Sequence, residues 1–326
     1  MSQPLVLADD VDAAARRIGS HVRRTPVISG RAADLGLPVD VVLKLELLQH
    51  TGSFKARGAF NRVLAALDAG EVPGSGLIAA SGGNHGMAVA HVARELGLSA
   101  EVFVPSTSPA TKRERIAALG ADVFVIDGLY DDAQVAADER GAVTGALAVH
   151  PYEHRAVVAG QGTVARELEE QVDGYDTLLV AAGGGGFIAG QAAWIGDRRR
   201  VVGVEPVASC CLRTALDHGR PTAVEVSGVA ADSLGAKRLG DIAWSVVRRF
   251  VDDAVVVDDD DIRDAQRVLW DQFRLVVEPG GATALAALRA AAFVPEAAER
   301  VVVIVCGSNC DPATVAHRNS HQHEQG

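Results

Sequence analysis

The sequence predicts an α/β protein with two open parallel sheets, and three observations carry this prediction. Glycine and alanine are frequent, while aromatic residues make up only 4% of the chain, which suits helices that lie close to a sheet. Apolar strand patterns alternate with helical patterns between residues 77 and 126, and again on a larger scale between residues 177 and 305. The stretch Pro73-Gly74-Ser75-Gly76 breaks the chain before the first of these regions, which indicates a crossing between domains.

The first alternating region predicts a small domain of its own. The expected strands are 77–80, 100–104 and 122–126, and the expected helices are 86–96, 109–119 and 130–140. Parallel strands need crossover connections of this length. We therefore expect a small parallel sheet in a domain inserted at residues 71–146.

The rest of the chain predicts a larger domain, formed by residues 1–70 and 147–326. Its expected strands are 41–47, 177–182, 201–205, 255–257 and 301–305, and its expected helices include 9–18, 156–172, 261–273 and 282–291. Strand 301–305 is fully apolar, as is typical of a strand buried on both faces. Residues 317–326 are polar and contain histidines, so we expect a disordered tail, with metal binding as the remote alternative.

The charge and the cysteines exclude several classes of protein. The formal net charge is −11, from 31 basic and 42 acidic residues, and no basic cluster indicates binding to nucleic acid or to a membrane surface. No signal peptide and no membrane-spanning segment is expected. The four cysteines show no zinc-binding spacing, so a reduced, cytoplasmic setting is expected. They are Cys210, Cys211, Cys306 and Cys310.

The stretch Thr51-Gly52-Ser53-Phe54-Lys55-Ala56-Arg57-Gly58-Ala59 places a lysine in the first turn of a predicted helix, with Ser53 as the expected N-cap. The positive end of the helix dipole disfavours an ammonium group at this point, and burial would act in the same direction. A neutral, nucleophilic amine is what a Schiff-base lysine needs. The alternative is a surface lysine on an ordinary helix.

The stretch Gly183-Gly184-Gly185-Gly186 lies between a predicted buried strand and a helix. Its backbone can approach an anion closely, and the free amides of a helix start point toward such a ligand. Ile188 stands where a dinucleotide fingerprint needs its third glycine, and no Gly-Lys-Ser/Thr follows as in a P-loop. We therefore predict a cup for one phosphate group; a tight strand-to-helix turn alone would hardly need four glycines.

Two further stretches follow predicted strands in the same manner. Ser81-Gly82-Gly83-Asn84-His85-Gly86 could hold a carboxylate with its hydroxyl and amides, although glycine and asparagine are also common in plain turns. Cys306-Gly307-Ser308-Asn309 follows the last apolar strand, at the edge where open α/β sheets bind ligands. Taken alone, Cys306 fits a small buried apolar residue equally well.

Together these stretches resemble the fold-type II pyridoxal phosphate enzymes, and within them the threonine/serine dehydratase group that includes serine racemase. The resemblance extends over nearly the whole chain. It includes the stretches above and also His150-Pro151-Tyr152, Ala159-Gly160-Gln161-Gly162-Thr163, Ala236-Lys237-Arg238-Leu239-Gly240 and Glu278-Pro279.

The resemblance implies a cofactor and a role for each site residue. Pyridoxal phosphate would be joined covalently to Lys55, which would also act on the α-proton of the substrate. The implied cofactor-binding residues are Phe54, Lys55, Asn84, Gly183, Gly184, Gly185, Gly186, Glu278 and Cys306. The implied substrate-binding residues are Ser81, Gly82, Gly83, Asn84, His85 and Tyr152. A homodimer is the assembly that the resemblance implies.

The chain departs from this group at some positions. Racemases of the group carry a second serine where this chain has Gly82, and the loss of one acid/base group costs about 10²- to 10⁴-fold in rate. Tyr152 stands where dehydratases tend to have an aromatic residue. Glu205 matches one acidic residue of a cation site in the racemase-like members, but Cys211 replaces the other, so no metal is expected. Ser233 replaces a glycine that is common near the cofactor ring.

These observations favour a lyase that eliminates water from L-threonine or L-serine to give a 2-oxo acid and ammonia. The alternatives are an amino-acid racemase and a dehydratase specific for 3-hydroxyaspartate or another β-hydroxy amino acid. A cofactor-binding protein with little catalysis is a further hypothesis, and a nicotinamide oxidoreductase is disfavoured because its glycine spacing is absent.

Overall fold

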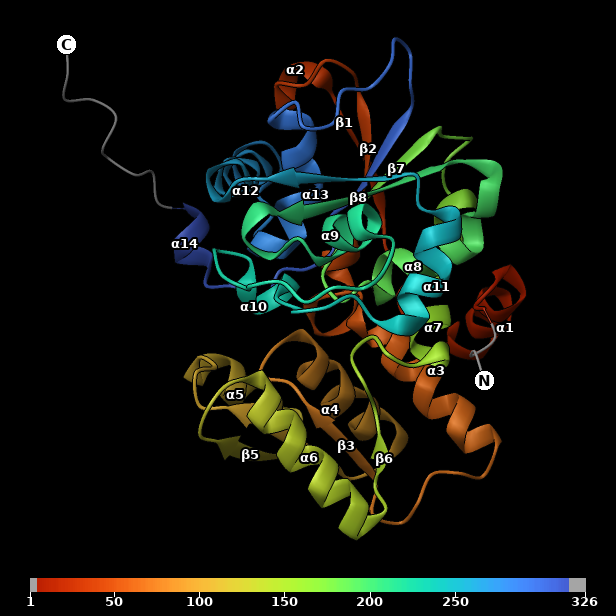
Figure 1. The fold of residues 1–326 in the computed structure, drawn as a ribbon, viewed down its shortest axis with the longest axis vertical. Helices are drawn as coiled ribbons and strands as arrows, with labels where there is room; N and C mark the ends of the chain where they lie inside the picture. Colours follow the sequence, from red (N-terminus) through yellow and green to blue (C-terminus); the bar gives the residue numbers. More distant parts are fainter. Residues whose placement is uncertain (1–4, 317–326) are drawn as a thin grey trace, which may run out of the picture.

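The computed structural model describes residues 5–316 and contains two parallel sheets, each with its own helices (Figure 1). The larger sheet has the strand order β1-β2-β10-β7-β8-β9. Its strands are β1 (Val27–Gly30), β2 (Val41–Lys44), β7 (Thr177–Ala181), β8 (Arg200–Pro206), β9 (Asp253–Val257) and β10 (Val301–Ile304). β1 pairs antiparallel with β2, and the other neighbouring strands are parallel. The predicted α/β class with two parallel sheets is confirmed.

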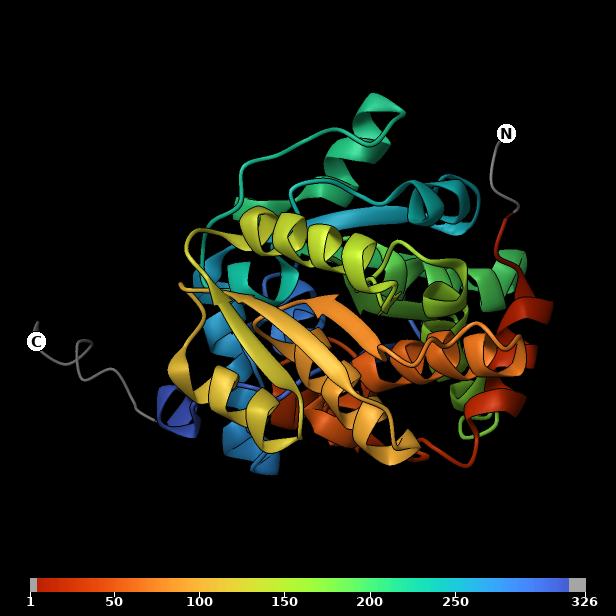
Figure 2. The same ribbon diagram turned by 90° about the horizontal axis from the view of Figure 1, so that it is seen from below.

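The smaller sheet has the strand order β5-β4-β3-β6 and is parallel throughout. It is formed by β3 (Leu77–Ala80), β4 (Ala100–Pro105), β5 (Asp122–Ile126) and β6 (Leu147–Ala148), with helices α4 (Asn84–Leu96), α5 (Ala110–Ala118) and α6 (Tyr130–Thr144). α4 and α5 pack on the face that presents Ala79, and α6 packs on the face that presents Ile78 (Figure 2). β6 lies beyond the boundary predicted at residue 146.

The remaining helices accompany the larger sheet. They are α1 (Ala8–Ile18), α2 (Ala32–Leu35), α3 (Lys55–Asp68), α7 (Arg155–Glu169), α8 (Gly186–Ile195), α9 (Cys211–His218), α10 (Ala231–Leu234), α11 (Asp241–Phe250), α12 (Asp259–Phe273), α13 (Pro279–Arg289) and α14 (Pro312–Ala316). In Figure 1 most of them surround the larger sheet in the upper part of the molecule, while α3 extends down toward the smaller sheet, which lies below. α3 contacts both α7 of the upper part and α4 of the lower part.

Glycine makes very close packing of α7 and α8 possible. A Cβ atom at Gly190 would lie 2.6 Å from the amide nitrogen of Gly162, and one at Gly162 would lie 2.7 Å from a methyl group of Val11. Any larger residue would push these helices apart. The abundance of glycine and alanine predicted helices close to a sheet, and here glycine also brings two helices close to each other.

Two local predictions are wrong. The strand predicted at 41–47 ends at Lys44, and a 3₁₀ turn at Glu46–Leu48 follows. Ser53 is not the N-cap of α3, because the N-cap is Phe54 and Ser53 has extended dihedral angles. Ser53 instead forms an isolated bridge with Gly307, a tertiary contact that its local sequence does not reveal. The tail predicted at 317–326 lies outside the described residues.

The described part of the chain contains neither a membrane-spanning helix nor a disulfide. Among residues 5–316 no helix is both long and apolar enough to cross a bilayer. Cys210, Cys211, Cys306 and Cys310 are all free thiols.

Candidate active site

Segments from distant parts of the sequence meet at the carboxyl edge of the larger sheet. β10 and β7 are parallel neighbours, so the turns that follow them leave the sheet at the same edge. The amide of Phe54 donates a hydrogen bond to the carbonyl of Cys306 at 3.2 Å, next to the bridge between Ser53 and Gly307. The start of α3 is thereby fixed to the turn after β10.

Lys55 is the first residue of α3, and its side chain is mostly buried. Its Nζ donates a hydrogen bond to the carbonyl of Pro151 at 3.0 Å. Burial lowers the pKa of the Lys55 amine from 10.5 to about 8, although the nearby Cys306 and Glu278 act in the opposite direction. A substantial fraction of the amine is therefore neutral near physiological pH, which a nucleophilic lysine requires.

The other lysines of the chain are committed to carboxylates. The sequence contains four lysines, and all of them lie in the described part of the chain. Lys44 pairs with Glu167, Lys112 with Asp232, and Lys237 with Asp131. Lys55 has no ion pair among residues 5–316, so its amine is the one most available for covalent chemistry.

The pKa of Lys55 predicts how covalent uptake of an aldehyde cofactor depends on pH. Below about pH 8 the amine is mainly protonated and cannot attack, so the uptake rate of the apoprotein should rise with pH and level off above that value. Stopped-flow absorbance with added pyridoxal phosphate would measure this rate. A rate that keeps rising up to the ordinary lysine pKa of about 10.4 would contradict the burial argument.

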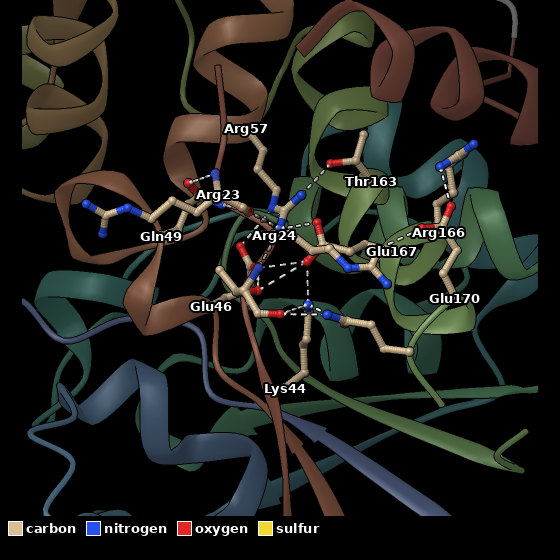
Figure 3. A network of polar contacts seen from close by, with 12 residues as sticks. Arg23, Arg24, Lys44, Glu46, Gln49, Arg57, Thr163, Arg166, Glu167 and Glu170 are labelled. Carbon is tan, nitrogen blue, oxygen red and sulfur yellow. Dashed lines mark hydrogen bonds and ion pairs between the residues drawn. The ribbon is translucent and has the colours of Figure 1, made fainter. Parts of the chain in front are cut away.

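A buried network of charges holds the helix that carries Lys55 (Figure 3). The Arg57 guanidinium donates to both carboxylate oxygens of Glu46, at 2.9 and 2.7 Å, and to Glu167 at 3.0 Å. The Nζ of Lys44 also donates to Glu167, at 2.5 Å, and to the carbonyl of Thr25 at 2.7 Å. Arg57 and Glu46 are almost completely buried. The network joins α3, α7 and the end of β2. It holds α3 at Arg57, two residues after Lys55.

The turn Gly183–Gly186 has the properties of an anion cup. Within the described residues, the amides of Gly183, Gly184 and Gly185 donate no hydrogen bond inside the protein, and α8 begins at Gly186. Gly185 has a φ of +86°, a backbone conformation that favours glycine. A Cβ atom at Gly184 or Gly186 would lie 2.7 Å from atoms of Tyr152. Free amides at a helix start in a turn that excludes side chains fit a phosphate group.

Replacing Gly184 by alanine should weaken cofactor binding. The added Cβ would clash with the Tyr152 ring, so the turn must shift. Its amides would then no longer point toward the phosphate. We expect the Kd for pyridoxal phosphate to rise about tenfold or more, as when one hydrogen bond to a charged group is lost. Titration followed by cofactor absorbance measures this. Gly74→Ala is the matched control, because a Cβ there meets nothing within 4 Å; equal Kd values for the two variants would contradict the cup.

Asn84 lies at the centre of a chain of side-chain hydrogen bonds between the two sheets. Its Nδ2 donates to Glu278 at 2.6 Å, and its Oδ1 accepts from Nδ2 of Asn309 at 2.7 Å. Burial raises the pKa of Glu278 to about 7, even though Asn84 favours the charged form. Asn84 begins α4 of the smaller sheet, whereas Glu278 and Asn309 belong to the larger one.

Cys306 is buried directly after β10, and its thiol donates to the carbonyl of Gly280 at 3.4 Å. Burial, together with the nearby Glu278, raises the pKa of this thiol strongly. The group is therefore a neutral, weak hydrogen-bond donor at physiological pH.

The Ser81–His85 stretch contains the turn between β3 and α4 and the first two residues of α4, Asn84 and His85. The Ser81 hydroxyl accepts a hydrogen bond from the amide of Gly83 at 3.2 Å. His85 is buried against the carbonyl of Val149 at 2.6 Å, and burial together with the positive charge of Lys55 lowers its pKa to about 3. His85 is therefore neutral, and its ring donates to that carbonyl. Gly82 contacts Ser108, which precedes α5.

Two aromatic residues lie next to the glycine turn. The rings of Phe54 and Phe187 stack with their centroids 3.8 Å apart, and Phe187 directly follows the turn. The Tyr152 ring covers Gly184 and stacks edge-on against His150. The structure thus places Tyr152 against the predicted phosphate cup, and its role at the substrate stays a prediction.

Glu205 and Cys211 have partners other than a metal ion. The Glu205 carboxylate accepts the amides of Leu212 and Arg213, both at 2.8 Å, at the start of α9. The thiol of Cys211 donates to the carbonyl of Gly183 at 3.2 Å. No group of three His, Cys, Asp or Glu side chains suited to a metal is found among residues 5–316. The expected absence of a metal stays a prediction.

A cavity of about 820 Å³ opens between the two sheets on the side of Glu278 and Asn309, and neither Lys55 nor the glycine turn lines it. Glu278, Ser233 and Asn309 line it from the larger sheet, and Pro109 and Lys112 line it from the smaller one. Asn309 belongs to the Cys306–Asn309 stretch, but the sequence alone does not predict its hydrogen bond with Asn84. Phe187 and Ser108 were missed because no local pattern marks them.

Two parallel sheets with a buried lysine at a helix start and a bare glycine turn define a class of α/β enzyme with the fold-type II architecture. The family model described as "Pyridoxal-phosphate dependent enzyme" matches residues 18–307. The chain therefore belongs to the family of pyridoxal phosphate-dependent enzymes.

Relatives with three different activities are similar to this chain to nearly the same degree. A serine racemase from Oryza sativa subsp. indica is 35% identical over 91% of this chain and 89% of its own length. A phenylserine dehydratase from Ralstonia pickettii is 35% identical over 92% of each chain. The solved structure of a threonine deaminase from T.th. matches with a TM-score of 0.86 and 34% identity, over 94% of this chain and 99% of that one. Overall similarity therefore does not decide between these reactions, and the decision depends on the residues of the site.

Proposed function

We propose that this chain eliminates water from L-threonine or L-serine and releases a 2-oxo acid and ammonia. The observation that carries the proposal is the amine of Lys55, which has a lowered pKa, lies near Cys306 and Glu278, and stands at a helix start that is bridged to the turn after β10. The dehydratase and deaminase relatives support it.

Each part of the site has a role in this proposal. Bound pyridoxal phosphate would supply an electron sink for the α-carbon of the amino acid. The amides of Gly183–Gly186 would hold its phosphate, while Phe54, Asn84, Glu278 and Cys306 would hold its ring. The Nζ of Lys55 would form the covalent link and take up the α-proton of the substrate. The Ser81–His85 turn would bind the substrate carboxylate with its hydroxyl and helix-start amides.

The neutral thiol of Cys306 supports elimination. A weak donor leaves a facing ring nitrogen largely unprotonated, which makes a mild electron sink. A mild sink suits a reaction in which the β-hydroxyl leaves and no long-lived carbanion is stored. Gly82 also offers no side-chain group for returning a proton to the opposite face of the α-carbon.

A racemase is the second candidate. The serine racemase from rice supports it, and so does the hydroxyl of Ser108, which occupies the space beside Gly82. This hydroxyl comes from another segment of the chain. The turn therefore has a hydroxyl group beside it even though residue 82 is glycine.

A substrate panel tests the proposal. We expect the enzyme with pyridoxal phosphate to release 2-oxo acid from L-threonine or L-serine faster than from 3-hydroxyaspartate or phenylserine, measured by a coupled dehydrogenase assay. D-serine formed from L-serine, measured by chiral chromatography, should be at most a minor product. If D-serine accumulates faster than pyruvate, the lyase proposal is wrong and the protein is a racemase. If the cofactor binds stably but neither a 2-oxo acid nor D-serine forms, the protein is a cofactor-binding protein without this catalysis.

The proposal includes a cytoplasmic homodimer. The free thiols of the described cysteines support a reducing compartment. Light scattering should give twice the chain mass of 33.9 kDa.

A further inference from the structure

Gly82 and Ser108 compete for the same space. The turn that contains Gly82 follows β3, whereas Ser108 lies between β4 and α5. A Cβ atom at residue 82 would coincide with the Oγ of Ser108 and lie 2.6 Å from its Cβ. The φ of Gly82 is not in the left-handed region, so the backbone would permit a side chain there. Residue 82 is therefore glycine because Ser108 fills the space that a side chain at this position would occupy.

The hydroxyl of Ser108 has no partner of its own. Ser108 is 9% exposed, and its amide donates to the carbonyl of Pro105 at 2.9 Å. Among residues 5–316 its hydroxyl makes no hydrogen bond. The residue is largely buried, but its oxygen is not among the fully buried unpaired polar atoms of the described residues, so the hydroxyl is free to bond a ligand or water.

The surroundings of this hydroxyl point to an anionic ligand. It lies against Gly82, two residues before Asn84 begins α4, and therefore close to the amides of a helix start. The residues that follow Ser108, Pro109 and Lys112, line the cavity that also reaches Glu278 and Asn309. Ser108 does not itself line that cavity, and it adjoins the candidate site through its contact with Gly82.

We propose that Ser108 is a substrate-binding residue, whose hydroxyl takes the place of a side chain at position 82 and donates a hydrogen bond to the substrate carboxylate. The inference rests on the proposed function, because it assumes that the Ser81–His85 turn binds an amino acid. It assigns part of the substrate site to the segment before α5.

Ser108→Ala removes the hydroxyl and keeps the Cβ that packs on the turn. We expect the KM for L-serine to rise about tenfold while kcat changes less than about twofold, because a hydrogen bond to a charged group is lost in the ground state and the transition state alike. The Kd for L-alanine, followed by the absorbance of the bound cofactor, should rise by the same factor, since L-alanine keeps the carboxylate and lacks the β-hydroxyl. An unchanged KM and Kd would overturn the proposal, and a rise for L-serine alone would overturn the assignment to the carboxylate.

A positional exchange separates hydrogen bonding from space filling. Ser108→Gly makes room for a side chain at residue 82, so Gly82→Ser/Ser108→Gly returns the hydroxyl from the other segment, and Gly82→Ala/Ser108→Gly returns only volume. We expect the first double variant to recover a KM within about threefold of the wild-type value, while the second keeps the tenfold rise. Equal values for the two double variants would show that the hydroxyl has no binding role and would overturn the proposal.

The L-alanine titration keeps this inference apart from the proposed reaction. If the wild-type enzyme releases no 2-oxo acid but Ser108→Ala still weakens L-alanine binding tenfold, the proposed reaction fails and the role of Ser108 stands. If the wild-type enzyme is active and neither constant responds to the hydroxyl, the role of Ser108 fails and the reaction stands.

Discussion

Replacing Lys55 by alanine is expected to abolish both activity and the covalently linked cofactor. The variant loses the amine whose pKa lies near 8 and with it the group proposed to take up the α-proton. General base catalysis alone contributes about 10²- to 10⁴-fold, so we expect 2-oxo acid release to fall at least that far. The absorbance of the cofactor after desalting should disappear in the same sample.

Lys237→Ala is the matched control for this experiment. Lys237 is 58% exposed and pairs with Asp131 on the surface, so its loss should leave both readouts near their wild-type values. A Lys55→Ala protein that keeps the linked cofactor, or that stays active, would refute the assignment.

Replacing Arg57 by leucine is expected to give the largest loss of stability. The Glu46 carboxylate is completely buried, and although burial alone would raise its pKa, Arg57 holds it below its ordinary value. Without Arg57 this charge loses both of its hydrogen bonds from a guanidinium in a medium that cannot hydrate it. We expect the free energy of unfolding to fall by about 3–5 kcal/mol, measured by urea denaturation.

Two further variants identify the cause. Arg24→Ala removes a partner from an exposed pair with Glu170 and should cost less than about 1 kcal/mol. Glu46→Leu/Arg57→Leu removes both buried charges and should recover part of the loss. If Arg57→Leu were no more harmful than Arg24→Ala, the network in Figure 3 would contribute little to holding α3.

The parts of the site that depend on local sequence could be predicted. Lys55 at a helix start and the four glycines after a buried strand each carry their signal within a few residues, and parallel strand patterns bring such turns to one edge of a sheet. The carboxyl ends of β7 and β10 do meet there. The general α/β class follows from the same patterns.

The parts that depend on packing between distant segments could not be predicted. Arg57 reads as an ordinary helix residue until the fold places Glu46 and Glu167 around it. The sequence marks Gly82 as a departure from the racemases but does not show that Ser108 fills the space of its missing side chain. Serine is a favoured residue at helix N-caps, but Ser53 forms a bridge with Gly307 instead, so a tertiary contact overrides the local preference.

The most direct test is to find the lysine that carries the cofactor. The protein with bound pyridoxal phosphate would be reduced with borohydride, digested and mapped by mass spectrometry, and its four lysines make the result unambiguous. We predict that the pyridoxyl label lies on Lys55 alone. A label on Lys44, Lys112 or Lys237, or cofactor bound with no label on any lysine, would contradict the account.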